Sequence, residues 1–291
     1  PGTDDLTVGN PQLGLSEVQS WDARVEFVWG TYADLFAVSV FQKDIEDPIE
    51  QIVIRDPAVF EDSATDTFRT FFNNPNEATI RGIELETRLN LSLLTLDFLD
   101  VEVPGRPFLD FLEFVSIGGN YSYFDAEVRR TQAELARSVS FFGDTEGVPQ
   151  GPRNPPGPAA YHALERKRRL YGQPEWIANA DISFDQPSWG TKVTLAFFAI
   201  SDLLDAAGVA APDQSGRIRS FTLDRYVDSY EQLDLVISQE LWKGFAVKFS
   251  AKNLTDSKRA IVYDPEQTAH RIPEREYRRG RDYSFTLSWK F

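Results

Sequence analysis

The sequence ends with the stretch Asp282-Tyr283-Ser284-Phe285-Thr286-Leu287-Ser288-Trp289-Lys290-Phe291. Apolar or aromatic side chains occupy every second position, and every side chain between them is polar. Because successive side chains of a β-strand point to opposite faces, the stretch predicts a strand with one apolar and one polar face. Its ten residues also match the roughly 9–11 residues that a strand needs to cross a bilayer.

Strand-like patterns recur along the whole chain, so that the sequence predicts nine strands. Besides the last one, they lie at about 21–29, 35–48, 83–91, 115–123, 176–185, 190–203, 233–238 and 245–252. The strands at 35–48 and 190–203 are apolar on both faces over part of their length. The polar faces carry many charges, and we expect Glu84 and Glu86 to face water there.

The links between these strands alternate in length. Short links lie at 30–34, 186–190 and 242–244, and long ones at about 55–78, 128–169, 204–225 and 256–275. The segment 93–113 breaks this alternation as an apolar insertion, and a small amphipathic helix is expected at 131–142. Short turns at one end and long loops at the other are typical of an outer-membrane β-barrel.

Composition excludes several classes of protein. The chain has 30 Lys and Arg against 45 Asp and Glu, a net charge of −15, which argues against nucleic-acid binding. The absence of cysteine excludes disulfides, thiolate nucleophiles and cysteine-ligated metals. The longest apolar run, 195–200, is far shorter than the roughly 18 residues of a membrane helix. Because the chain begins at Pro1, we expect a mature form, a fragment or part of a longer chain.

A soluble β-sandwich would also show alternating strands, because two apolar faces then meet in a core. Here aromatic residues stand near the strand ends, among them Trp21, Trp29, Tyr283 and Trp289. This placement is typical of the two aromatic belts at the surfaces of a membrane. The pattern therefore favours an antiparallel transmembrane β-barrel over the sandwich.

Several short motifs resemble those of the TonB-dependent outer-membrane receptors, in the same order along the chain. They are Gly9-Asn10-Pro11-Gln12-Leu13 with Ser16-Glu17, residues 41–49 (FQKDIEDPI), residues 76–86 (NEATIRGIELE), Asn253-Leu254-Thr255-Asp256 and Gly280-Arg281. The chain departs from the family pattern at Leu15, where the family usually has proline. Each motif is short, but together they span almost the whole chain.

The resemblance implies that residues 1–291 are the C-terminal part of a barrel of about 22 strands, with a plugged lumen. We expect the plug domain, the N-terminal strands and the contact with the TonB complex to belong to a longer chain or a second piece. The barrel-insertion machinery is expected to read the last strand through Tyr283, Phe285, Leu287, Trp289 and Phe291. Thr286 stands where that signal often has glycine.

Signals of an enzyme are nearly absent, and we expect no catalytic, cofactor-binding or metal-binding residues. The two histidines, His162 and His270, both lie in expected loops, which leaves no Ser-His-Asp or two-histidine metal spacing. The basic run 165–169 (ERKRR) could bind an anionic ligand or lipopolysaccharide phosphates. The preferred interpretation of this run is a solvated junction between a loop and a strand.

The expected function is that of a receptor in the bacterial outer membrane, in contact with lipid and lipopolysaccharide. It would import a scarce nutrient such as a siderophore, a vitamin or a glycan, energised through TonB, and the sequence does not identify the ligand. A passive porin or structural barrel subunit is the first alternative, and a soluble β-sandwich binding module the second. Because nine strands cannot close an antiparallel barrel, the sequence also predicts an open sheet.

Overall fold

The fold consists almost entirely of strands. The computed structural model describes residues 6–290, except 31, 33, 56–66, 96–110, 136–164, 213–217, 243 and 265–270. Within this part of the chain, no helix has the length and apolar character needed to cross a membrane.

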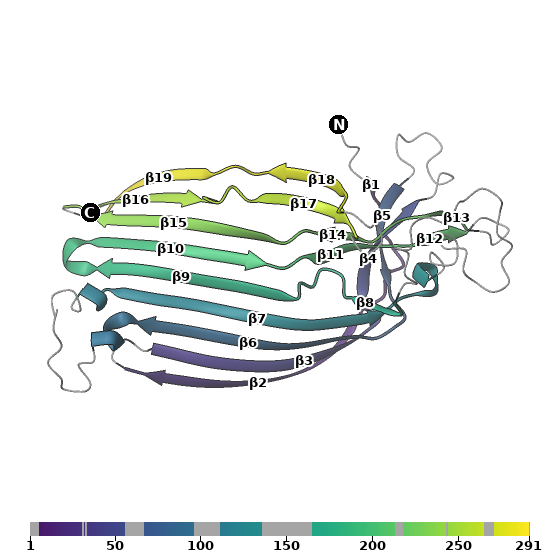
Figure 1. Ribbon diagram of the computed structural model, residues 1–291, viewed down its shortest axis with the longest axis horizontal. Coiled ribbons are helices and arrows are strands. Elements are labelled where there is room, and N and C mark those ends of the chain that lie inside the picture. The colour runs from purple at the N-terminus through teal and green to yellow at the C-terminus, as the bar shows by residue number, and fades with distance from the viewer. Residues whose placement is uncertain are drawn as a thin grey trace.

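Nine long strands form one antiparallel sheet, as the sequence predicts (Figure 1). In sheet order they are β2 (Glu17–Trp29), β3 (Asp34–Glu46), β6 (Ala78–Asn90), β7 (Val115–Arg129), β9 (Trp176–Gln186), β10 (Thr191–Ile200), β15 (Tyr230–Glu240), β16 (Phe245–Lys252) and β19 (Asp282–Trp289). The short strand β8 (Lys167–Arg169) pairs with the last residues of β7. We call this array the main sheet.

The two ends of the main sheet differ as the link lengths predict. Tight turns join β2 to β3, β9 to β10 and β15 to β16, and the chain terminus after Trp289 lies at the same end, the turn end (Figure 1). The turn after β9 contains the 3-10 helix η3 (Pro187–Trp189). Another 3-10 helix, η1 (Leu91–Thr95), follows β6. The long connections lie at the opposite end, the loop end. Most of the apolar insertion, residues 96–110, falls outside the described residues.

The long connections are not simply loops, which corrects the sequence prediction. A second sheet at the loop end contains β1 (Leu6–Thr7), β5 (Thr67–Asn73), β4 (Ile49–Arg55), β11 (Leu203–Gly208), β14 (Arg225–Val227), β17 (Lys258–Tyr263) and β18 (Pro273–Arg278), in that order. A further pair joins β12 (Ala210–Pro212) to β13 (Ile218–Phe221). Of the expected helix at 131–142, residues 132–135 are helical and the rest from 136 on is outside the described residues.

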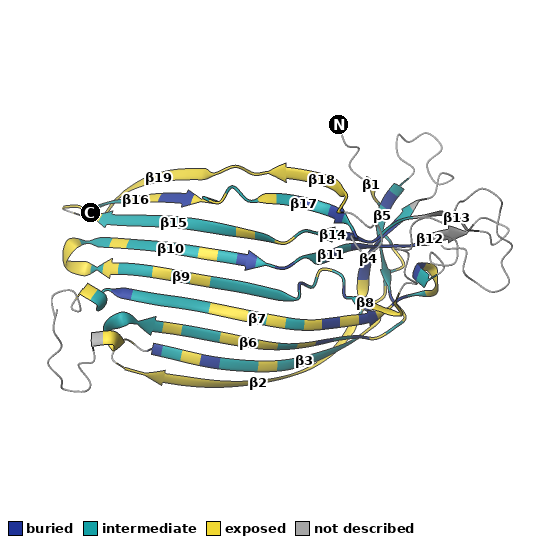
Figure 2. Cartoon of the chain, viewed as in Figure 1, coloured by how far each residue is buried: buried dark blue, intermediate teal, exposed yellow. Residues whose placement is uncertain are grey.

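The main sheet is open, as predicted. Among the described residues, its two edge strands, β2 and β19, each have a partner strand on one side only. All residues of β2, β18 and β19 are exposed (Figure 2). The described residues therefore form a partial barrel wall with two unpaired edges.

The register places the apolar positions of the main sheet on one common face. Phe285 is opposite Phe249, which is opposite Ile237, and Ile237 is opposite Val193. The same continuity holds farther along the sheet, where the following residues form a row. They are Ala23, Val40, Ile83, Tyr123 and Trp176. We call this the apolar face, and the opposite one the polar face.

Gly82 is required by a close approach between strands. A Cβ atom at this position would lie 2.3 Å from the ring of Phe41 and 2.9 Å from the backbone oxygen of Tyr123. Phe41 in β3 is directly opposite Gly82, and its ring packs at 5.9 Å from that of Phe124 in β7. The absent side chain lets this aromatic pair cover the backbone of β6.

We therefore expect Gly82→Ala to lower the free energy of unfolding by about 1–3 kcal/mol, the cost typical of overpacking. The measurement is denaturant unfolding of the full-length protein in detergent micelles. Gly9→Ala is the matched control, because a Cβ atom there meets nothing within 4 Å. Equal stability of the two variants would contradict the close packing at Gly82.

Candidate functional site

The polar face of the main sheet carries ionic and amide pairs within and between strands. Arg24 lies 2.5 Å from Glu26 and 2.8 Å from Glu86, which belongs to β6, two strands away. Asn179 donates a hydrogen bond to Asn120 at 2.8 Å. Glu84 shares this face with Glu86, as the sequence predicts, because residues two apart on a strand point the same way. A face of this composition is suited to water.

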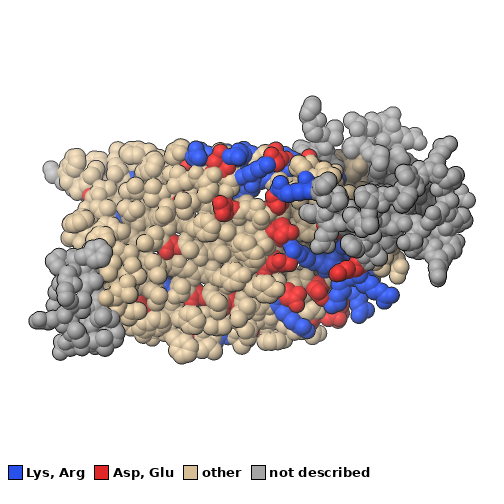
Figure 3. All heavy atoms as spheres, viewed as in Figure 1, with Lys and Arg blue, Asp and Glu red and all other residues tan. Residues whose placement is uncertain are grey.

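Toward the loop end the two faces exchange their character without any break in β3, β6 or β7. On the formerly polar face, Ala78, Ile80, Ala126, Val128 and Leu170 form a buried cluster. On the opposite face, the row after Ile83 and Tyr123 contains Gln42, Arg81 and Asp125. On the face that it shows, Figure 3 has few charged side chains in the turn-end half and many near the loop end. The environment of the strands therefore changes at this level.

A shallow pocket of about 310 Å³ lies at the level where the faces change character. Its apolar lining includes Trp21, Ile83 and Tyr123, and its polar lining includes Arg81 and Asp125. Arg81 donates a hydrogen bond from Nε to Gln42 at 3.1 Å. The pocket thus spans the boundary between apolar and polar surface.

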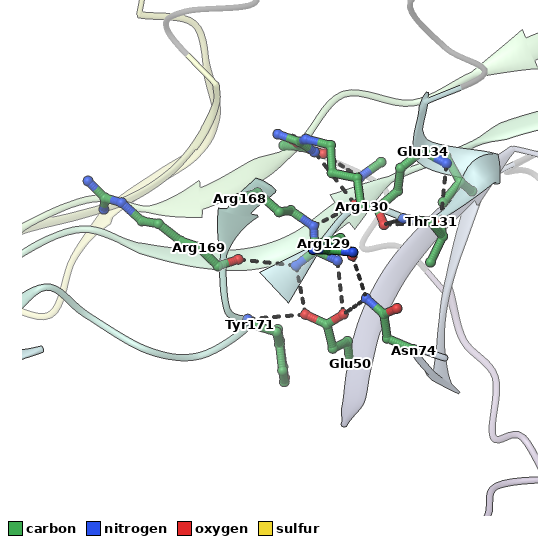
Figure 4. A network of polar contacts seen from close by, with 12 residues as sticks. Glu50, Asn74, Arg129, Arg130, Thr131, Glu134, Arg168, Arg169 and Tyr171 are labelled. Carbon is green, nitrogen blue, oxygen red and sulfur yellow. Dashed lines mark hydrogen bonds and ion pairs between the residues drawn. The ribbon is translucent and has the colours of Figure 1, made fainter. Parts of the chain in front are cut away.

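Arg168 lies at the centre of a buried ionic network at the loop end (Figure 4). Its Nη1 and Nη2 donate to the two carboxylate oxygens of Glu50, at 2.6 and 2.9 Å. Its Nε donates to Glu134 at 2.5 Å. The Arg168 side chain is 1% exposed, and both carboxylates are fully buried. The guanidinium fork therefore joins two carboxylates from different connections of the chain.

Glu134 has two roles in this network. Its Oε2 accepts hydrogen bonds from the backbone N and the hydroxyl of Thr131, while its own N donates to the Thr131 hydroxyl. This reciprocal arrangement is a capping box, which satisfies backbone donors at a helix start. Its Oε1 remains for Arg168 and for Arg130, which is 3.5 Å away.

Further contacts extend the network. Asn74 donates to Glu50 at 2.7 Å, and the backbone N of Tyr171 donates to the same carboxylate. Arg130 binds Asp224 at 2.9 Å, and Asp224 also accepts from the backbone N of Gly208 at 2.7 Å. The network therefore links the β3–β6, β7–β9 and β10–β15 connections.

The electrostatics of the network keep Arg168 charged. Burial alone would lower the pKa of Arg168, but Glu50 and Glu134 outweigh this effect and raise it above the usual arginine value. Burial raises the pKa of Tyr226, and the carboxylates of Asp224 and Asp264 raise it further. Both groups thus keep their ordinary protonation states at neutral pH.

The basic run is consequently not a solvated junction at Arg168, which is buried and not available to an anion. Its neighbours are also paired, Lys167 with Glu127 at 2.5 Å and Arg169 with Glu175 at 2.6 Å. The sequence gives no sign of the partner Glu50, whereas the Thr131-x-x-Glu134 spacing is a readable capping signal.

No metal-binding group of three or more His, Asp or Glu side chains occurs among the described residues. His162 and His270 lie outside this part of the chain. Four of the expected terminal residues, Tyr283, Phe285, Leu287 and Trp289, share the apolar face and are all exposed, and Phe291 is not described.

Comparisons with known proteins agree with this architecture. Residues 1–254 match the family described as TonB dependent receptor-like, beta-barrel. No curated protein matches the chain by sequence.

The chain is also similar to solved structures. The unliganded ferric citrate transporter FecA has a TM-score of 0.51 at 14% identity, over 94% of this chain and 31% of its own. The outer membrane transporter YddB from Escherichia coli has a TM-score of 0.49 at 14% identity, over 99% of this chain and 34% of its own. The ferric-catecholate import receptor Fiu from E. coli K12 has a TM-score of 0.46 at 12% identity, over 96% of this chain and 28% of its own. The chain thus spans about a third of the length of these proteins.

Removal of the central guanidinium should be costly. We expect Arg168→Met to lower the free energy of unfolding by about 3–5 kcal/mol, because it leaves the buried Glu50 without its counter-charge and removes the Nε donor from Glu134. Lys167→Met is the matched control, since its exposed pair with Glu127 contributes at most about 1 kcal/mol. Thermal unfolding of both variants in detergent measures the difference, and equal midpoints would refute the assigned importance of Arg168.

Proposed function

Because the chain belongs to the TonB-dependent receptor family through its β-barrel domain, we propose that it is the C-terminal part of an outer-membrane active-transport receptor. Proteins of this family are transporters and receptors in the bacterial outer membrane rather than enzymes. The complete receptor imports a scarce nutrient, such as a siderophore, a vitamin or a glycan. TonB energises the import through a plug domain outside residues 1–291.

The observation that carries this proposal is the exchange of polarity between the two faces. In the turn-end part of the sheet, the apolar face suits lipid and the polar face suits a water-filled lumen. At the loop end, the outward side chains are polar, as expected above the level of a membrane. A soluble sandwich does not account for this change along single strands, because its core remains on one side.

Tryptophan placement agrees with the same interpretation. Trp29, Trp189, Trp242 and Trp289 all lie at the turn end, in or beside its turns and the last strand. Trp21 lies near the level at which the faces exchange character, and lines the pocket there. Tryptophan concentrates at membrane–water interfaces, so these residues indicate the two levels of the membrane surfaces.

The open edges require further strands. In lipid, each unpaired backbone group of β2 and β19 would cost several kcal/mol. We therefore propose that the other barrel strands, to a total of about 22, pair with both edges. They would come from the same gene or from a separate chain.

In this arrangement the loop end is extracellular, close to lipopolysaccharide, and the turn end is periplasmic. The barrel-insertion machinery would engage Tyr283, Phe285, Leu287, Trp289 and Phe291 on the exposed edge strand. No partner role for nucleic acid is proposed.

The functional experiment compares uptake with and without TonB. The complete gene is expressed in a strain without related receptors. The probes are the iron-55 complexes of a catecholate, a hydroxamate and citrate, and cobalt-57 cobalamin. The cells should accumulate the radioactive metal from one of these four probes. Uptake should require TonB. Uptake that persists after deletion of TonB would instead indicate a passive porin.

Lipid contact predicts effects of very different size at two adjacent residues of β19. Phe285→Arg should destabilise the barrel by about 2–4 kcal/mol, because it places a charge in the lipid near the membrane centre. Ser284→Arg, on the polar face, is the matched control and should cost much less. Unfolding from phospholipid vesicles measures both, and a larger effect at Ser284 would reverse the assignment of the faces.

A further inference from the structure

The hairpin β4–β5 takes an unusual course across the loop end. It belongs to the connection between β3 and β6, yet β4 pairs in parallel with β11, which directly follows β10. In the main sheet, three strands, β6, β7 and β9, lie between β3 and β10 on this path. Figure 1 shows β4 running across the direction of the long strands near their loop end. The hairpin thus bridges distant parts of the wall.

The hairpin lies on the side of the polar face. Arg168 is opposite Val128 in the β7–β8 pair, and Val128 belongs to the buried cluster on that face. The guanidinium of Arg168 is bound to Glu50 of β4. The outward-facing neighbours Lys167 and Glu127 are exposed and pair with each other instead. The hairpin is therefore joined to the inner side of the wall.

Several independent contacts hold the hairpin in place. Ile52 packs with Leu204, Ala207 and Val209 in a second buried cluster. The hydroxyl of Thr222 donates to the backbone oxygen of Val53 at 2.5 Å. Arg69 of β5 forms an ion pair with Asp205 of β11.

The ends of the hairpin are also held by polar contacts. At its base, Asn74 donates to the backbone oxygen of Arg129 in β7 at 3.2 Å. At its start, the carboxylate of Glu50 is fully occupied by Arg168, Asn74 and the N of Tyr171. Apolar burial, parallel pairing and buried charge therefore act on the same segment.

We propose that the β4–β5 hairpin is a fixed roof over this side of the lumen, and that Arg168 locks it there. The proposal rests on the proposed function in one respect, that the polar face lines the lumen. Entry of a ligand is then restricted to the part of the mouth that the hairpin leaves open. Segments that move readily in proteins have few buried contacts, whereas opening this one would separate buried charges.

Cysteine labelling on intact cells tests the roof, because the chain contains no cysteine of its own. In the complete receptor, Val53→Cys introduces a thiol at a fully buried position of β4, and Ile49→Cys one at a position that is 41% exposed. The probe is a membrane-impermeant maleimide. We expect Val53→Cys to react at least about 10-fold more slowly than Ile49→Cys, because local opening limits its labelling.

Adding Arg168→Met should raise the labelling rate of Val53→Cys to within about twofold of Ile49→Cys, as expected when opening is frequent. Adding Lys167→Met, the control on the same strand, should leave it unchanged. Equal rates for the two cysteines with Arg168 intact would overturn the roof. Slow labelling of Val53→Cys that persists in Arg168→Met would overturn the locking role.

A second measurement applies if Arg168→Met does not assemble. Ile52 and Ala207 are direct partners in the parallel β4–β11 pair, so the double variant Ile52→Cys/Ala207→Cys should cross-link on mild oxidation with Arg168 intact. Absence of the cross-link would overturn the roof. If Ile49→Cys were labelled only after permeabilisation of the membrane, the proposed orientation would be overturned instead. Uptake that does not depend on TonB would overturn the proposed function.

Discussion

A common register across nine strands is the constraint on which the rest of the structure depends. A slip of one residue between two strands would move every side chain of one of them to the opposite face. Within the main sheet, the described pairings of neighbouring strands run without register shifts. Shifts occur instead in the pairs β11–β14, β12–β13 and β17–β18, all in the long connections. Regularity is thus kept where a whole face must stay apolar.

The exchange of polarity at the loop end follows from the same regular strands. Because β3, β6 and β7 continue through this level, the backbone does not redirect their side chains. The residue types change instead. On the same face, the apolar pair Ile83 and Tyr123 is followed by the charged pair Arg81 and Asp125. Apolar residues such as Ala126 and Val128 then point inward and are buried by packing with Leu170. This buried cluster lies beside Arg168, which is opposite Val128 and binds Glu50 of the hairpin.

Period-two alternation was sufficient to predict the nine main strands, their short turns and the open sheet, because each long strand pairs with the next long strand along the chain. It was not sufficient for the second sheet. Strands such as β14 are only a few residues long, and β4 pairs with β11 from a different connection. Arg168 illustrates the limit, since it is separated from Glu50 by 118 residues and nothing local distinguishes it from the exposed Lys167. The sequence showed a basic run, but not which member would be buried.

The buried network has a structural role that an apolar cluster could not fill equally well. Replacing buried ion pairs by apolar residues is often neutral or stabilising, so the network is weak evidence for stability as such. Its geometry, however, is selective. Arg168 presents a planar fork that needs Glu50 from one connection and Glu134 from another, and Glu134 is itself held by the capping box with Thr131. An apolar contact would tolerate a shifted hairpin, whereas a shifted Glu50 would leave charges buried without partners. The network therefore specifies where the hairpin crosses the wall.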